Sequence, residues 1–152
     1  MVFSKICLVT VPIETLWEFM IDAQAVSACM PGLETFRQVT EDQFEGLVKI
    51  SLGPISIRLN GTISVLERER STWLSRMSAQ ARDLKIGGDV KATFTTRLVQ
   101  ASAYETEIRI DTEAKVLGKL GEFGQPIMKK TADRYLTQFV ENITKALTAP
   151  ST

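Results

Sequence analysis

The apolar residues of the chain change their spacing twice. Residues 2–10 form an apolar-rich segment that predicts a first strand. The next apolar positions recur at intervals of three and four residues, which predicts an amphipathic helix that has Pro12 in its first turn. These positions are Ile13, Leu16, Trp17 and Met20. A second short helix is expected over residues 23–30, capped by Asp22 and ended by Pro31-Gly32.

From Leu33 to about residue 117 the spacing of apolar residues becomes two. The alternation is clearest over residues 104–112, where every second position is charged. Such alternation predicts antiparallel strands with one dry and one solvated face. Gly46 and Gly61 fall inside these strands, where glycine often marks a bend, so the sheet is expected to curve. Turns are expected at Gly53-Pro54, Glu69–Ser71 and Gly87-Gly88.

The last segment returns to a helical period, from about Gly118 to the C-terminus. Pro126 either begins this helix in its first turn or kinks it. A long amphipathic helix needs a dry surface, and a one-sided sheet offers one. The sequence therefore predicts a single α+β domain over residues 1–152, in which a curved antiparallel sheet grips the helix. The apolar stripe of the helix comprises Leu120, Phe123, Ile127, Leu136, Phe139, Val140, Ile143 and Leu147.

Composition removes several functional classes. Eighteen basic and eighteen acidic residues cancel, so there is no basic excess to attract nucleic acid. The chain has no histidine, the usual metal ligand and neutral-pH acid or base, and we expect no metal or cofactor. Cys7 and Cys29 fit no zinc or redox spacing and are expected to be reduced core thiols. No segment approaches the roughly 20 apolar residues of a spanning helix, so we expect a cytoplasmic protein.

Four short motifs, taken together, resemble one known family. They are Ala28-Cys29-Met30-Pro31-Gly32, Leu52-Gly53-Pro54-Ile55, Asn60-Gly61 and the run from Gly118 to Ile127. In order and spacing the chain is similar to the CoxG family of carbon monoxide dehydrogenase subunits, within the START/Bet v-type helix-grip (SRPBCC) superfamily. This resemblance implies a seven-stranded antiparallel sheet around the C-terminal helix, enclosing an apolar cavity. Superfamily members bind lipids, sterols, polyketides, hormones or quinones, and a minority are cyclases or hydratases.

The resemblance also implies a partner. CoxG proteins accompany molybdenum-containing dehydrogenases of the carbon monoxide and xanthine type, and are associated with their attachment to the membrane and their link to quinone. We therefore expect a quinone or lipid as ligand and a molybdenum hydroxylase or CO dehydrogenase as partner, at the inner face of the membrane through that partner. Several members carry a C-terminal extension that reaches the membrane. Because this chain stops at Thr152, we expect peripheral contact without an anchor of its own.

The dry face of the sheet is the expected ligand site, although for any single residue a filled core is the simpler explanation. Gly46, Ser75, Ala79 and Ala92 fall at inward positions and leave space. Small-molecule sites are mostly apolar with a few polar groups. The expected ligand-binding residues are Met30, Val48, Ile50, Ile57, Leu59, Trp73, Met77, Phe94, Thr96, Tyr104, Thr106, Ile108, Ile110, Phe123 and Ile127.

Hydroxyl groups and loops complete this expected site. Thr96, Thr106, Thr112 and Tyr104 either orient a ligand's carbonyl or hydroxyl, or bond the backbone. The loops Met30–Gly32 and Arg82–Gly88 are expected either to gate a cavity mouth or to serve only as turns.

Catalysis has little support from the sequence. The strand carboxylates occupy solvated positions, and no nucleophile stands beside a base. We therefore expect a non-catalytic protein that binds a lipophilic ligand. One alternative is a pure assembly protein with a filled core. The other is a cyclase or hydratase in which Tyr104 reaches into the cavity. The solvated carboxylates include Glu105, Glu107, Asp111 and Glu113.

Overall fold

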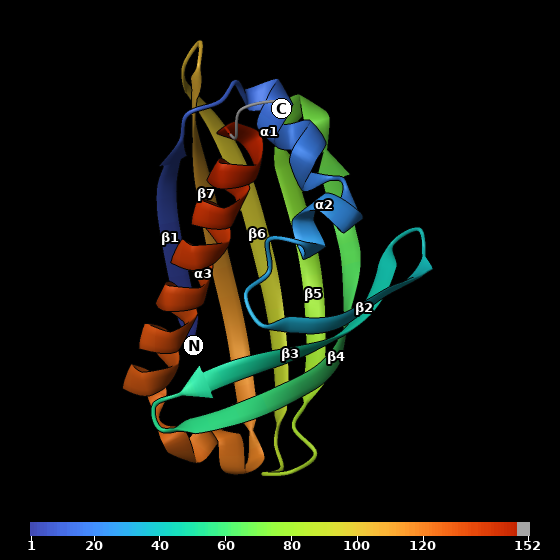
Figure 1. Cartoon of the computed structure of the whole chain (residues 1–152), viewed down its shortest axis with the longest axis vertical. Coiled ribbons are helices and arrows are strands. Elements are labelled where there is room, and N and C mark those ends of the chain that lie inside the picture. Colours follow the sequence, from blue (N-terminus) through green and yellow to red (C-terminus); the bar gives the residue numbers. More distant parts are fainter. Residues whose placement is uncertain (149–152) are drawn as a thin grey trace.

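The computed structural model describes residues 1–148 and contains a seven-stranded antiparallel sheet. The strand order is β1-β7-β6-β5-β4-β3-β2, so consecutive strands are neighbours except where β1 joins β7. This confirms the expected helix-grip fold (Figure 1). The strands are β1 (Val2–Val9), β2 (Leu33–Thr40), β3 (Gln43–Leu52), β4 (Ile55–Glu69), β5 (Leu74–Arg82), β6 (Asp89–Ser102) and β7 (Glu105–Leu117).

The helices stand on the concave side and at the ends of this sheet (Figure 1). The long helix begins at Gln125 with Pro126 in its first turn, so the first of the two expected arrangements holds. The second short helix ends at Ser27, three residues early, because the chain tightens into turns in which Met30 N–H donates to Ser27 O. Among residues 1–148, no helix has the length and apolarity needed to cross a membrane. The helices are α1 (Ile13–Met20), α2 (Ala23–Ser27) and α3 (Gln125–Thr148), with short 3-10 segments η1 (Arg70–Thr72) and η2 (Gly118–Phe123).

The sheet curls most strongly where β3 and β4 sweep across the front of the molecule (Figure 1). Gly46 and Gly61 lie directly opposite each other in these two strands. A Cβ atom on Gly61 would collide with the backbone oxygen of Gln80 in β5 and lie 2.7 Å from the Cβ of Ala81. The strands therefore approach more closely here than a side chain allows, and the expectation that these glycines mark a bend is confirmed.

Among the described residues, all the buried apolar side chains except Phe44 belong to two separate clusters at opposite ends of the concave face. The first, here the helix cluster, joins α1 and α3 to the upper parts of β6 and β7 in Figure 1. The second, the turn cluster, joins the β3–β4 turn to η2. The helix cluster contains Val9, Val11, Ile13, Leu16, Trp17, Cys29, Leu98, Ile108, Ile110, Val140 and Ile143. The turn cluster contains Leu52, Ile57 and Leu120.

Candidate functional site

The middle of the concave face, between the two clusters, is only half-buried. Met77 and Phe94 are cross-strand neighbours there, and both remain partly exposed although they face inward. Next to them runs a row of small residues, because Ala79 pairs with Ala92 and Ala92 pairs with Ala114. We call this region the central hollow. Its apolar side chains are half-buried, whereas the core residues of the two clusters beside it are buried.

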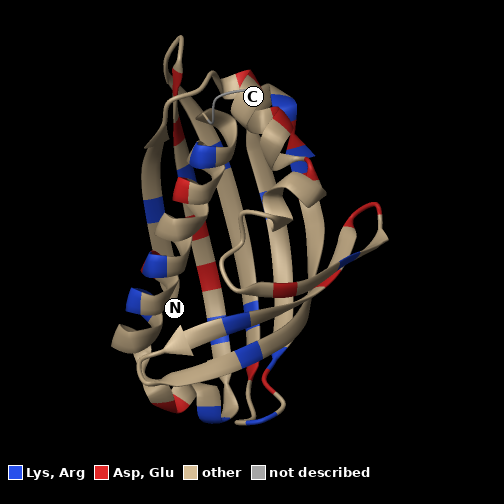
Figure 2. Cartoon of the chain, in the orientation of Figure 1, with Lys and Arg blue, Asp and Glu red and all other residues tan. Residues whose placement is uncertain are grey.

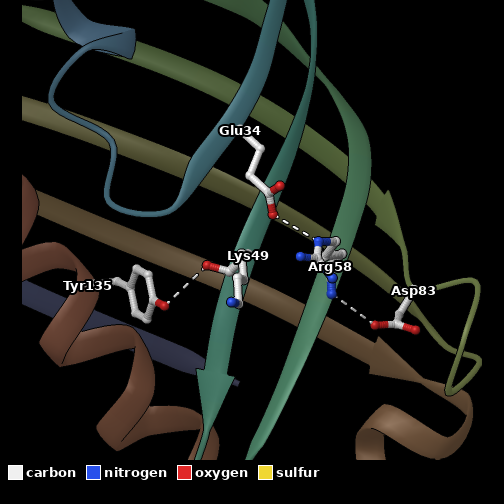
Figure 3. A network of polar contacts seen from close by, with 5 residues as sticks. All are labelled: Glu34, Lys49, Arg58, Asp83 and Tyr135. Atoms are coloured by element: carbon white, nitrogen blue, oxygen red, sulfur yellow. Dashed lines mark hydrogen bonds and ion pairs between the residues drawn. The ribbon is translucent and has the colours of Figure 1, made fainter.

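Hydrogen bonds from α3 hold the walls of the central hollow in place. The Tyr135 hydroxyl donates to Lys49 O at 3.3 Å (Figure 3). The same hydroxyl accepts from Ser51 N–H at 3.2 Å. The Arg134 guanidinium donates to Ser51 O at 2.7 Å. Higher on the helix, the Asn142 amide donates to Cys29 O at 2.9 Å. These contacts tie both β3 and the loop that carries Met30 to the same helix.

Thr112, on the inward face of β7, has a side-chain hydroxyl without a hydrogen-bond partner among the described residues. It lies between Phe3 and Phe94 in the sheet and is only 5% exposed. A buried hydroxyl without a partner costs free energy, about 1–3 kcal/mol. Thr106 differs, because its hydroxyl donates to Val11 O at 2.8 Å and so follows the backbone-bonding alternative. The Thr112 hydroxyl therefore lacks a hydrogen bond that the described residues could supply.

Twelve of the fifteen ligand-binding residues expected from the sequence divide into two groups. One group builds the two clusters, where its members pack against the protein itself; the other faces the central hollow or its edge. Whether any of them contacts a ligand stays a prediction. The first group contains Ile108 and Ile110, Trp73 packed on the helix cluster, Ile57, and Ile50, Leu59 and Phe123 packed on the turn cluster. The second contains Met30, Val48, Met77 and Phe94, which are half-buried, and Thr96, which is buried.

Two of the expected residues do not face inward. Tyr104 lies in the β6–β7 turn and is 75% exposed, so its expected inward placement is wrong. The alternation predicted across residues 104–112 does not reach it, because β7 begins at Glu105 after a register shift between Gln100 and Ser102. Ile127 is 42% exposed. It borders a groove that is also lined by Lys130 and Arg134 of α3 and by Gly53 of the β3–β4 turn.

Two open grooves lie on the outside of the molecule. One, of about 620 Å³, runs along α3 beside Gly53 of the β3–β4 turn. The other, of about 530 Å³, is lined by the N-terminus and by residues of β5, β6 and β7, among them Ala79, Ala92 and Ala114. Neither corresponds to an enclosed cavity between the sheet and α3. The central hollow is therefore defined by its half-buried apolar floor and its buried hydroxyl.

The two thiols lie where the sequence predicts. Both are free; Cys29 is buried in the helix cluster and Cys7 packs against that cluster. Burial raises the pKa of both thiols. They are therefore protonated at neutral pH and unreactive, in keeping with a structural role.

Sequence reasoning missed the buried carboxylate of Asp83, which is 2% exposed. One carboxylate oxygen accepts from the N–H groups of Lys85 and Ile86 at 2.8 Å each, and the other accepts from Arg58 N–H at 3.2 Å (Figure 3). These bonds fold the loop over residues 83–88 and attach it to β4. They favour the turn role of this loop over a gate. An aspartate followed closely by Gly87-Gly88 is a turn signal, but its contact with β4 is invisible in the sequence.

We expect Asp83→Asn to lower the free energy of unfolding by about 2–3 kcal/mol. The asparagine loses the charge, and its NH2 group must face a backbone N–H that needs an acceptor. Urea denaturation followed by circular dichroism measures the effect. Asp42→Asn, at an exposed turn, is the matched control and should change the unfolding free energy by less than about 0.5 kcal/mol. Equal effects of the two changes would contradict this role of Asp83.

Solved structures with this fold resemble the chain closely despite low sequence identity. A conserved protein from Geobacillus kaustophilus has a TM-score of 0.88 at 18% identity, covering 97% of this chain and 95% of its own. A START superfamily protein from Mycobacterium smegmatis has a TM-score of 0.67 at 15% identity, with 96% of each chain covered. Norcoclaurine synthase from Thalictrum flavum, in truncated form, has a TM-score of 0.69 at 14% identity, covering 99% of this chain and 95% of its own.

The sequence comparisons complete this picture. No curated protein matches the chain. The profile of one family, the G-type subunit of carbon monoxide dehydrogenase (CoxG), matches residues 7–148, which span both clusters, the central hollow and α3. The chain therefore belongs to the CoxG family of carbon monoxide dehydrogenase subunits and has the fold of the START superfamily.

Proposed function

We propose that this protein binds a lipophilic small molecule, a quinone or a lipid, in the central hollow without transforming it. The proposal rests on one observation. Met77 and Phe94 are apolar, face inward and remain half-buried, and the buried hydroxyl of Thr112 beside them has no hydrogen-bond partner among residues 1–148. Apolar surface removed from water contributes about 25 cal/mol per Å², so covering about 100 Å² is worth roughly 2.5 kcal/mol. The Thr112 hydroxyl would then orient the ligand by donating to a carbonyl or accepting from a hydroxyl.

We further propose that the bound molecule serves a molybdenum-containing dehydrogenase of the carbon monoxide or xanthine type. The family's description names carbon monoxide dehydrogenase, which supports an accessory role beside such an enzyme. An accessory protein of this kind would need a site for the electron acceptor or lipid rather than a catalytic centre.

The alternatives draw different support from the structure. An enzyme of the cyclase or hydratase type would need an acid or base that reaches a bound substrate, and Tyr104, the candidate from the sequence, lies in an exposed turn. A pure assembly protein would leave the hollow empty or filled by its own side chains. The binding experiment below separates that alternative from ours.

Titration with a benzoquinone that carries one isoprenoid unit tests the proposal. We expect saturable binding by equilibrium dialysis, with quenching of Trp73, which packs at the edge of the helix cluster 5.8 Å from Trp17. Thr112→Val should weaken this binding about fivefold to tenfold, because the orienting hydrogen bond is lost. It should also stabilise the empty protein by about 1 kcal/mol, because the unpartnered hydroxyl is removed.

Thr10→Val, on an exposed position of the loop after β1, is the matched control and should leave binding unchanged. Absence of saturable binding, together with no lipophilic molecule in organic extracts of the purified protein, would contradict the proposed function. Binding that Thr112→Val leaves intact would contradict the role of the hydroxyl alone.

A further inference from the structure

The two edge strands of the sheet differ in how their free edges are protected. An edge strand presents unpaired N–H and C=O groups, and proteins usually protect it with charges or bulges. β2 has both devices, because its register shifts twice against β3 and it carries Glu34 and Arg37. β1 pairs with β7 along its whole length without a shift, and its one charged residue is Lys5. Figure 2 shows this single blue band on β1 beside the several charged bands of β2 and its turn.

The even-numbered residues of β1 form its free edge. Met1 exchanges two backbone hydrogen bonds with Ala114, at 2.7 Å from its amino group and at 2.8 Å to its carbonyl. Bonded and non-bonded pairs alternate along an antiparallel ladder, so the odd-numbered residues of β1 bond to β7. The N–H and C=O groups of the even-numbered residues point away from β7, and within residues 1–148 no backbone group of another segment bonds to them. These residues are Val2, Ser4, Ile6 and Leu8.

The side chains of the same residues make this edge apolar. Val2 is 62% exposed, Ile6 61% and Leu8 54%, and Ser4 stands among them. They lie on the convex side of β1, whereas α3 packs on its concave side (Figure 1). Exposed apolar side chains along a free edge favour pairing with another strand. One added strand would therefore satisfy the free backbone groups and cover the apolar side chains together.

We propose that β1 pairs with β1 of a second copy of this chain, antiparallel and about a twofold axis at Ser4. The two sheets then continue into each other, and the contact is isologous because the same strand supplies both sides. Ser4 faces Ser4 of the other copy, and Val2 faces Ile6 on both sides of the axis. Apolar cross-strand pairs of this kind stabilise a sheet. The pairing involves the outer edge alone, so it holds whether or not the central hollow carries a ligand.

The side chains of β1 select this register over its neighbours. The free backbone groups bond only if even-numbered residues face even-numbered residues, which allows an axis at Ser4, Lys5 or Ile6. An axis at Lys5 would set two ammonium groups opposite each other, and like charges in that position are unfavourable. An axis at Ile6 would place Leu8 opposite Ser4, an apolar group against a hydroxyl. With the axis at Ser4, each Lys5 keeps its ion pair with Asp133 of α3, at 2.9 Å.

Charge favours a second copy over a segment of another protein. Eighteen basic and eighteen acidic residues cancel, so two copies do not repel each other over a distance. The convex side of β1 is uncharged, and nothing on this edge selects a charged segment. The neighbouring charges of β7 are already engaged, because Arg109 pairs with Glu107 at 2.6 Å and Asp111 accepts from the Ser4 hydroxyl at 2.7 Å.

Sedimentation velocity of the full chain, at concentrations from about 1 to 300 μM, tests the pairing. We expect a monomer–dimer equilibrium, because one strand pair gives a small interface. Ser4→Glu should weaken dimerisation about 30-fold or more, since two carboxylates then face each other at the axis. Ser4→Lys should weaken it to a similar extent, for the same reason. An equimolar mixture of the two variants should dimerise within about threefold of the wild type, because opposite charges then meet.

Leu66 of β4, which is 53% exposed, provides the matched control. Leu66→Glu and Leu66→Lys, alone or mixed, should change the dimerisation constant by less than about twofold. Circular dichroism checks that the Ser4 variants keep the fold, as expected for an exposed position. A wild type that stays monomeric would overturn the proposal and leave the edge to a strand of another protein. A dimer that Ser4→Glu leaves intact, or a mixture of the Ser4 variants that stays monomeric, would overturn it too. Quinone binding is measured separately and does not enter this outcome.

Discussion

Gly61→Ala should destabilise this protein by about 3 kcal/mol or more. The new Cβ would collide with the backbone oxygen of Gln80 and press on Ala81 in β5. Neither atom belongs to a flexible side chain, so β4 and β5 must separate locally. Separation breaks ladder hydrogen bonds in the middle of the sheet. A typical domain is stable by only about 5–15 kcal/mol, so much of its stability would be lost.

Urea denaturation followed by far-ultraviolet circular dichroism measures this loss. Gly121→Ala is the matched control, because its Cβ would lie 3.3 Å from Val116 O at an exposed position without a positive φ. We expect the control to cost less than about 1 kcal/mol. A Gly61→Ala protein as stable as the control would show that β4 and β5 tolerate a wider spacing. The curl of the sheet would then have a different cause.

The sequence predicts most of this fold because its patterns are local. Period-two segments and turn residues predict the strands, and the apolar stripe with Pro126 predicts the long helix. Gly46 and Gly61 lie where the sheet bends. A glycine within a strand already indicates such a place, because a side chain would not fit there. The predicted end of the second short helix lies three residues too late, since nothing local distinguishes a helix end from the tight turns at Cys29 and Met30.

The candidate site is less predictable because it depends on contacts between distant segments. The alternation of inward and outward positions along the strands places Ile108 and Phe94 on the same, inward face of the sheet. The positions of α1 and α3, whose residues form one cluster with Ile108, decide that Ile108 is buried and Phe94 is half-buried. Asp83 bonds to Arg58, 25 residues away, and no pattern in the loop announces that contact. For Tyr104 the local pattern misleads. The alternation predicts that Tyr104 faces inward, but β7 begins only at Glu105, so Tyr104 lies in the turn before the strand.

Ala92→Phe should abolish ligand binding, with an affinity loss of about 100-fold or more. Ala92 stands between Ala79 and Ala114 in the row of small residues on the hollow's floor. A phenyl ring there would occupy the space that we assign to the ligand. If that space is open, the ring replaces water and the free energy of unfolding changes by less than about 1 kcal/mol. If the space is already filled, overpacking costs about 1–3 kcal/mol.

The stability of this variant therefore decides between a hollow and a solid core even before a ligand is identified. Quinone titration and urea denaturation are to be measured on the same preparations. Thr93→Phe, the next residue of β6 and on the opposite face of the sheet, is the matched control. It should keep both binding and stability near those of the wild type. Loss of stability in Ala92→Phe with no binding in the wild type would leave the pure assembly protein as the better description. Retained stability with lost binding would place the lipophilic ligand on the floor between the two clusters.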